Sequence, residues 1–311
     1  RVPAQYGGAG MNDPGRLMLL GDEAVARGAW DAGMTAAYAY PCTPSTEILE
    51  YLVPRAADGG FTAHWCANEK TAYEQALGVS MMGRRALVAM KHVGLNVAMD
   101  PFVNSALVAI GGGLVVAVAD DPGMHSSQNE QDSRVLADFA RVPCLEPADQ
   151  QEAYDMTREA FDLSERFGVP VMVRLVTRLC HSRAVVTPGP PRGQSPLAKA
   201  AAPQDWTLLP HHARRLWRHL LDRLPEIRDA AEASPHNRFD PGDPGAPFVP
   251  VTQTDRGYFF VLSQVLCQRA AQCPGPFAVN NVHLPKAGDN RFVKKPLQRF
   301  LALFGGHAAQ M

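Results

Sequence analysis

The sequence predicts an α/β fold, in which a doubly wound parallel sheet carries helices on both faces. From about residue 17 to residue 186, short apolar runs alternate with amphipathic or Ala-rich stretches at the spacing of strand–helix units. The run 114–119 (LVVAVA) is apolar throughout, as in a strand buried on both faces. Polar segments follow five predicted strands, as expected where the carboxyl ends of parallel strands meet a ligand.

The predicted elements alternate along this part of the chain. Strands are expected at 34–40, 61–67, 85–90, 114–119 and 169–176. Helices are expected at 21–33, 46–57, 71–82, 96–109 and 149–167. Thr43 and Asn68 are suited to cap the second and third of these helices, and Pro44 is suited to the first helical position.

Four parts are predicted along the chain. They are an N-terminal tail (1–15), the alternating domain (16–186), a Pro-rich linker with a helix (187–250), and a partial second α/β unit (251–311). The linker helix is expected at 214–233 with an interruption at Pro225. The last part predicts a strand at 251–254, a turn at Gly257, a helix at 259–271 and a strand at 277–282. So few elements cannot bury much surface alone, and we expect them either to pack on a partner or to be a truncated domain.

Composition excludes several classes of function. The 311 residues include 30 basic and 31 acidic side chains, so no large positive field favours nucleic acid or an anionic membrane surface. No apolar run reaches the ~18 residues of a membrane span, and residues 1–16 lack the apolar core of a secretory leader. The six cysteines form no Cys-x-x-Cys pair, so we expect no zinc or iron–sulfur ligation on this chain. Reduced thiols and a cytoplasmic location are expected.

Polar side chains collect after the predicted strands. The five segments are 41–46 (PCTPST), 68–70 (NEK), 91–96 (KHVGLN), 120–132 (DDPGMHSSQNEQD) and 177–183 (TRLCHSR). Loops are commonly polar, so a single polar segment would not by itself indicate a ligand site. Five at the same edge of a parallel sheet predict a shared pocket.

Three side chains in these segments suggest chemistry. Glu69 begins a nearly apolar helix, where its carboxylate would be partly buried, although a helix N-terminus also favours glutamate for electrostatic reasons. Lys91 and His92 follow a buried strand. An ammonium and an imidazole there could handle a carboxylate or a proton, or simply cap the strand end.

A metal-dependent hydrolase is a different interpretation of the longest polar segment. Its ligands would be Asp120, Asp121, His125 and Asp132. Their spacing fits no standard metal signature. The sequence also lacks a phosphate-binding Gly-x-x-x-x-Gly-Lys-Ser/Thr loop and a Gly-x-Ser-x-Gly nucleophile elbow.

Several of these segments resemble one family. They are GDEAVARGAWDAG, AYPCTPSTEILE, NEKTAYEQALG, MKHVGLNVAMDP and ADDPGMHSSQNEQD. Together they resemble the 2-oxoacid:ferredoxin oxidoreductase superfamily, most of all the large subunit of indolepyruvate ferredoxin oxidoreductases. The resemblance covers about 17–183 and continues weakly into VTQTDRGYFFVLSQVL, which is similar to the start of the family's transketolase C-terminal-like domain. It implies a pyrimidine-binding domain for thiamine diphosphate.

The resemblance also implies roles for single residues. Glu69 matches the glutamate that hydrogen-bonds the aminopyrimidine ring and promotes the tautomer from which the reactive carbanion forms. Thr43 matches a residue that contacts the 2-oxo acid carboxylate or the cofactor, and Pro41 and Asn68 lie beside these two positions on the cofactor side.

Further residues are candidates for the substrate side of the cofactor. Lys91 and His92 are expected to act in catalysis, His92 by assisting proton transfer. The substrate-binding candidates, besides Thr43, are Asn96, His125 and Arg183, with His181 a further possibility and Ser126, Gln128 and Asn129 shaping the pocket or a subunit contact.

The sequence departs from the family pattern in ways that imply partners. It lacks the Gly-Asp-Gly…Asn motif that holds Mg²⁺ and the diphosphate, since 288–290 (GDN) does not fit, and it lacks the Cys-rich ferredoxin-like motifs. Cys42 stands where the family usually has glycine. The diphosphate half of the site and the iron–sulfur clusters would then come from partner chains or a missing domain. A split, multi-subunit relative of the phenylglyoxylate type fits this arrangement, as does a piece of a longer chain.

The implied activity is the CoA-dependent oxidative decarboxylation of an aryl 2-oxo acid of the indolepyruvate, phenylpyruvate or phenylglyoxylate type. Electrons would pass through iron–sulfur clusters on partner subunits to ferredoxin or another acceptor, in a hetero-oligomer. The alternative is a non-catalytic structural subunit of such a complex. Cofactor bound beside Glu69 would distinguish the two.

Overall fold

The computed structural model describes residues 15–198, 201–237, 277–279 and 282–284. The chain divides into two compact units, 1–238 with 255–261, and 239–254 with 262–311. In the second unit the described residues form two antiparallel strands, β9 (Phe277–Val279) and β10 (Val282–Leu284), where one strand was expected over 277–282. The strand and helix expected at 251–254 and 259–271 lie outside the described residues.

A six-stranded sheet forms the centre of the first unit. Its order is β3 (Thr62–Trp65), β2 (Ala36–Ala39), β4 (Ala86–Lys91), β5 (Leu114–Asp120), β7 (Val171–Val176) and β6 (Cys144–Leu145). Every neighbouring pair is parallel. All residues of β4 and β5 are buried, as their continuous apolar sequences require. The predicted parallel α/β sheet is confirmed.

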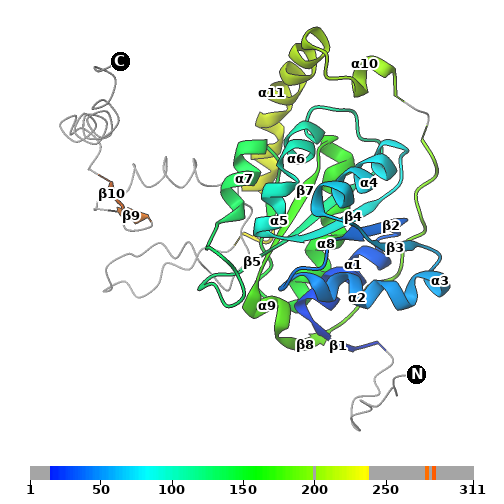
Figure 1. Ribbon diagram of the computed structural model, residues 1–311, viewed down its shortest axis with the longest axis vertical. Helices are drawn as coiled ribbons and strands as arrows, with labels where there is room; N and C mark the ends of the chain where they lie inside the picture. Colours follow the sequence, from blue (N-terminus) through cyan, green and yellow to red (C-terminus); the bar gives the residue numbers. More distant parts are fainter. Residues whose placement is uncertain (1–14, 199–200, 238–276, 280–281, 285–311) are drawn as a thin grey trace. The chain divides into compact units, whose positions relative to one another are not determined.

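Helices cover both faces of this sheet (Figure 1). One face packs against α1 (Gly21–Asp31), α2 (Thr46–Leu52) and α8 (Gln150–Phe167). The other face packs against α4 (Glu69–Met81), α5 (His92–Val97), α6 (Met99–Ser105), α7 (Ser133–Ala140) and α11 (Pro210–Glu232). Among the described helices, none combines the length and apolar character needed to cross a bilayer.

The remaining elements are short. The chain continues from α2 into a 3₁₀ turn (Val53–Arg55) and α3 (Ala56–Gly59), and α10 (Pro203–Trp206) precedes α11. A second sheet pairs β1 (Leu17–Leu20) antiparallel with β8 (Arg183–Val186), and α9 (Thr177–His181) leads from β7 into β8. The extended segment 187–198 runs along the first unit, where Arg192 N donates to the Asp31 carbonyl (2.8 Å) and Ala198 N to the Met82 carbonyl (3.0 Å).

The start of α2 differs from its prediction. Thr43 does not cap the helix and Pro44 is not its first residue, because Ser45 is the N-cap and the helix begins at Thr46. The Thr43–Pro44 peptide is cis. The Ser45 amide and hydroxyl both donate to the Cys42 carbonyl, at 3.0 and 2.9 Å, and close a turn ahead of the helix. This turn leaves the Thr43 side chain exposed.

Other boundaries differ because tertiary contacts outweigh local signals. The helix expected at 96–109 is two helices, and α5 starts directly after β4 at His92. The segment 177–183, expected as a loop, forms α9 and the start of β8. Helix α11 continues through Pro225, which is exposed, without the expected interruption. The short elements α7 and β6 were not predicted.

A buried charged network joins the carboxyl ends of β5, β6 and β7. Arg174 Nε donates to Asp120 Oδ2 at 2.7 Å, and its Nη1 donates to Glu146 Oε1 at 2.5 Å. Ser133 N at the start of α7 also donates to Asp120, at 3.0 Å. Burial alone would lower the pKa of Arg174, but the carboxylates of Asp120 and Glu146 raise it. The network therefore fixes the strand ends from which the polar loops depart.

Replacing Arg174 tests this network. Arg174→Met leaves the buried Asp120 carboxylate without its cation and Glu146 with Arg134 (3.4 Å), so we expect the free energy of unfolding in urea to fall by about 3–5 kcal/mol. Arg166→Met is the control, because Arg166 pairs with Glu226 on the surface (3.0 Å), where the expected loss is under about 1 kcal/mol. Equal losses in the two variants would contradict the structural role of the network.

Candidate functional site

The chain reverses its winding between two neighbouring strands, β2 and β4. After β2 it enters α2 on one face of the sheet, and after β4 it enters α5 on the other face. Chain segments that leave adjacent strand ends in opposite directions form the crevice where open α/β sheets bind ligands. The turn 41–46 and the pair Lys91–His92 lie at these two strand ends.

Glu69 is the first residue of α4, which follows the edge strand β3. Asn68 caps this helix as predicted, with its side chain accepting from Thr71 N at 2.9 Å. Glu69 is 6% exposed, and within the described part of the chain no hydrogen bond or ion pair engages its carboxyl group. A Cβ on Gly94 of α5 would lie 2.6 Å from Glu69 Oε1. The missing side chain of Gly94 therefore makes room for the carboxylate.

Cys42, Lys91 and Glu69 form one electrostatic cluster. Burial raises the pKa of the half-buried Cys42 thiol, the Lys91 ammonium lowers it, and the Glu69 carboxylate raises it. The three residues come from the β2 loop, the end of β4 and the start of α4. The fold thus brings a cation, a carboxylate and a thiol to the crevice.

The long loop after β5 holds the Lys91 ammonium. Lys91 is 2% exposed, and its Nζ donates to the Ser126 carbonyl (2.9 Å) and hydroxyl oxygen (3.2 Å). The Ser126 hydroxyl also lies 3.4 Å from the Thr43 carbonyl, to which it donates. Lys91 and the turn containing Thr43 are therefore linked through one serine.

Asp121 anchors that loop. Its carboxylate accepts from Ser126 N at 2.8 Å, from Thr177 Oγ1 at 2.8 Å and from the Ser127 hydroxyl. Burial alone would raise the pKa of Asp121, but these hydrogen bonds, with Ser127 the strongest, hold the pKa of the carboxyl well below its usual range. An ionised Asp121 therefore fixes the backbone that holds Lys91.

His92 contributes an unsatisfied nitrogen. The ring is fully buried, and Nε2 lies 3.2 Å from the Asn129 carbonyl oxygen. Because a carbonyl only accepts, the neutral ring carries its proton on Nε2. Nδ1 is buried and has no hydrogen-bond partner. Buried polar atoms rarely lack a hydrogen-bond partner, and a donor group on a bound ligand would satisfy Nδ1.

The other predicted site residues lie in varied settings. Pro41, Thr43, Asn96 and His125 are exposed at the carboxyl edge of the sheet. Arg183 lies on β8 of the second sheet, opposite Leu20. His181 lies 3.5 Å from Glu47.

The acidic residues of the 120–132 segment have structural partners. Asp120 binds Arg174, Asp121 binds serine and threonine hydroxyls, and Asp132 binds Arg134 Nη2 at 2.7 Å. In the described ranges, no group of three or more His, Cys, Asp and Glu side chains is arranged to hold a metal ion. These three carboxylates are therefore engaged in ion pairs and hydrogen bonds within the protein.

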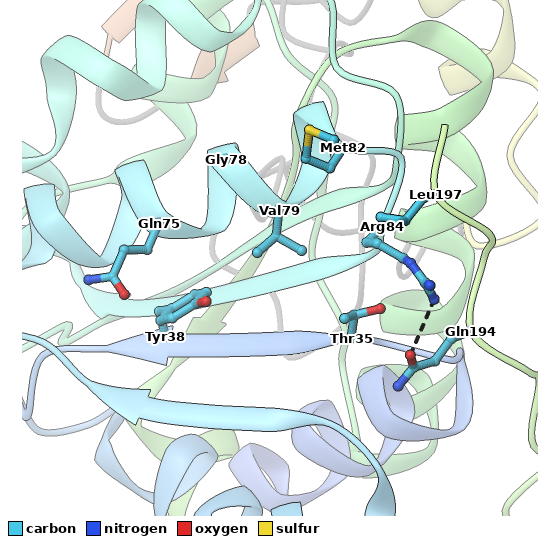
Figure 2. Close-up of a pocket in the computed structure, with 9 residues that line it drawn as sticks. All are labelled: Thr35, Tyr38, Gln75, Gly78, Val79, Met82, Arg84, Gln194 and Leu197. Atoms are coloured by element: carbon cyan, nitrogen blue, oxygen red, sulfur yellow. Dashed lines mark hydrogen bonds between the residues drawn. The ribbon is translucent and has the colours of Figure 1, made fainter. Parts of the chain in front are cut away.

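The sequence did not indicate that Asp121 anchors the loop or that Cys42 faces Lys91. The two consecutive serines after Asp121 were the available signal, since hydroxyls next to a carboxylate often form local turns. A surface groove elsewhere, between α4, β2 and the segment 194–197, contains none of the predicted residues. Figure 2 shows Arg84 and Gln194 joined across its end, at 3.3 Å.

Comparisons with known proteins agree on one family. A family model described as "Pyruvate flavodoxin/ferredoxin oxidoreductase, thiamine diP-bdg" matches residues 27–214. The indolepyruvate oxidoreductase subunit IorA of Archaeoglobus fulgidus is 45% identical over 234 residues, which are 73% of this chain and 38% of that protein. The 2-oxoglutarate synthase subunit KorA of Methanothermobacter thermautotrophicus is 32% identical over 180 residues, or 54% of this chain and 46% of that one.

A solved structure has the same fold. It is described as the 2-oxoglutarate:ferredoxin oxidoreductase from Magnetococcus marinus with 2-oxoglutarate, coenzyme A and succinyl-CoA bound. The TM-score is 0.57 at 18% identity, over 69% of this chain and 45% of that chain. This chain spans less than half the length of each of these relatives.

Asp121→Asn tests the anchored loop. The variant replaces the charged acceptor of three hydrogen bonds, and we expect unfolding in urea at pH 7 to cost about 1–3 kcal/mol less. Because the pKa of Asp121 is lowered on folding, its stabilisation is present above the unfolded carboxyl pKa and lost as pH falls through the folded pKa. The difference in the free energy of unfolding between the variant and the wild type should therefore become smaller below about pH 4. Asp138→Asn, on the exposed side of α7, is the control and should change neither the free energy of unfolding at pH 7 nor its dependence on pH.

Proposed function

This chain belongs to the pyruvate flavodoxin/ferredoxin oxidoreductase family of thiamine diphosphate-binding domains, and we propose that it supplies the pyrimidine-binding half of a 2-oxoacid oxidoreductase active site. One observation carries the proposal. The Glu69 carboxyl is buried without a hydrogen bond from the described chain, in a crevice that also holds the Lys91 ammonium.

The residues around Glu69 fit the aminopyrimidine ring. A buried carboxyl with a free oxygen can hydrogen-bond a ring nitrogen with little competition from water. The Glu69 carboxylate packs against Gly94, where a side chain would displace it, and Pro41 and Asn68 belong to the adjoining loops. When bound, thiamine diphosphate supplies a carbanion nucleophile and an electron sink. Mg²⁺ and the diphosphate would be held by a partner chain or by a further domain.

Lys91 and Thr43 are proposed to bind the substrate carboxylate. Two acceptors on Ser126 engage the Lys91 ammonium, which has three N–H donors, so one remains for a ligand. The Thr43 hydroxyl is exposed on the neighbouring turn, which Ser126 ties to Lys91. A cation and a hydroxyl at one position suit a carboxylate with an adjacent keto group.

His92 is proposed to move a proton. Its Nε2–H is fixed on the Asn129 carbonyl, which leaves the buried Nδ1 as the nitrogen that would accept a proton. Asn96 and His125 are proposed as further substrate contacts from exposed positions at the same edge. Arg183 is a weaker candidate, because its strand belongs to the second sheet.

The proposed reaction is CoA-dependent oxidative decarboxylation of an aryl 2-oxo acid. The indolepyruvate named in the IorA relatives supports the aryl substrate. Electrons would leave through iron–sulfur clusters on partner subunits to ferredoxin or another acceptor, in a cytoplasmic hetero-oligomer. A non-catalytic subunit is the alternative, and the retained, unpaired Glu69 counts against it.

Glu69→Gln tests the cofactor role in the assembled complex. The amide cannot exchange a proton with the ring, so we expect turnover to fall at least about 100-fold. The unfolding midpoint of the variant chain should stay near that of the wild type. Glu74→Gln, an exposed position on the same helix, is the matched control. Turnover close to that of the wild type in Glu69→Gln would refute the assignment.

Lys91→Met tests substrate binding. Loss of the ammonium should raise the KM for the 2-oxo acid by about 10-fold or more, since a hydrogen bond to a charged group contributes about 1.5–3 kcal/mol. The KM for coenzyme A should not change. Lys70→Met, an exposed lysine that pairs with Asp100, should leave both constants unaltered. An equal rise in both KM values for Lys91→Met would argue for a general structural defect instead.

A further inference from the structure

A buried carboxyl group and a half-buried one lie together beside the turn 41–46, outside the proposed chemistry. Asp22 is the second residue of α1 and Glu47 the second residue of α2. Asp22 is 0% exposed, and neither of its oxygens receives a hydrogen bond. Glu47 Oε2 is also buried without a partner. Three carboxyl oxygens are thus buried and unsatisfied.

Groups from three helices face this pair. Burial is the main cause that raises the pKa of Asp22 well above its ordinary value; the Cys180 thiol lowers it, and Glu47 and Glu23 raise it further. The Glu47 carboxyl is within hydrogen-bonding reach of Asp22. On the outer side, His181 Nε2 lies 3.5 Å from Glu47 Oε1.

Among the residues that the structure describes, no cationic side chain makes a hydrogen bond or ion pair with Asp22. Asp22 is fully buried beside a second carboxyl group, so burial and like charge both oppose its ionisation. The smallest change that satisfies the pair is one proton, which turns one oxygen into a donor toward the other carboxylate. The His181 imidazole then lies beside the oxygen of Glu47 that remains accessible.

We propose that Asp22 and Glu47 share one proton in the folded chain, and that the resulting hydrogen bond positions the turn 41–46. Glu47 follows that turn by one residue, and Asp22 belongs to the helix with the most extensive packing against α8. The shared proton thus attaches a short helix and its turn to a rigid part of the fold. Asp22 and Glu47 are positioning residues. The link to substrate rests on the role proposed for Thr43, but the shared proton does not.

The sign of the pH effect follows from the raised pKa. The folded chain keeps the proton at pH values where the unfolded chain has released it. The stabilisation is therefore complete below the unfolded carboxyl pKa, near 4, and is lost as pH rises toward the folded pKa. Alkaline conditions should loosen α2 and the turn before it.

Asp22→Asn provides the test, in thermal unfolding of the full chain between pH 5 and pH 9. Asparagine donates to Glu47 at every pH, so the unfolding midpoint of the variant should depend less on pH than that of the wild type. Between pH 5 and pH 9 the change in midpoint should be smaller in the variant by about 3 °C or more. Glu47→Gln should behave in the same way. The infrared spectrum of the wild type should contain a protonated-carboxyl C=O band that Asp22→Asn lacks.

Asp31→Asn is the matched control on the same helix. Asp31 is equally buried but accepts from Arg27 and from the Tyr154 hydroxyl, both at 2.8 Å, so its variant should be destabilised at neutral pH without removing the infrared band. Parallel pH profiles for wild type and Asp22→Asn would overturn the proposal. So would a wild-type midpoint that depends on added K⁺ and not on pH, because a metal cation would then neutralise the pair. Loss of turnover alone, with unchanged pH profiles, would bear on the proposed function and not on the proton.

Discussion

The hydrogen bonds from Lys91 to Ser126 are the contacts on which the candidate site depends. A buried ammonium must be held by acceptors, and here the acceptors belong to a loop that begins 30 residues later in the chain. That loop is in turn held by the ionised Asp121, which Thr177 reaches from the end of β7. Strand ends that are far apart in sequence are thereby fixed relative to one another.

The position of this contact follows from the topology. Strands β2 and β4 send their chains to opposite faces, so the space between their carboxyl ends is left for loops and ligands. Glu69 enters the same space from β3, because α4 runs back across β2 and β4. Its approach to α5 is possible since position 94 has no side chain. Sheet order, one glycine and one buried lysine thus define the site together.

Much of the fold was predictable from the sequence because its signals are local. The apolar run 114–119 and the cap at Asn68 specify a buried strand and a helix start through nearest-neighbour chemistry. The polar segments after the strands predicted a shared pocket, since parallel topology brings the strand ends to one edge; the site itself stays a prediction. The turn at Thr43 was not predictable in detail, because Ser45 competes with it as the cap.

The side-chain contacts within the candidate site could not be predicted from neighbouring residues in the sequence. The sequence offered Asp120, Asp121 and Asp132 as metal ligands because they are acidic and close together. In the structure their partners are Arg174, Thr177 and Arg134. Arg174 lies 54 residues from Asp120 and Thr177 lies 56 residues from Asp121, whereas Arg134 is a near neighbour of Asp132. Whether a carboxylate is free or paired depends on such distant residues. Glu69, by contrast, has no partner on the described chain.

The buried acids of this domain are therefore stabilised in three ways. Asp120 is paired with an arginine, Asp121 is hydrogen-bonded by hydroxyls and backbone, and Asp22 has the Cys180 thiol and another carboxyl group beside it. The second arrangement lowers the pKa of Asp121, whereas burial raises that of Asp22. Glu69 belongs to none of them. A carboxyl on a buried residue that no group of the described chain hydrogen-bonds is suited to a ligand that brings its own hydrogen-bonding nitrogen, and the aminopyrimidine of thiamine diphosphate is such a ligand.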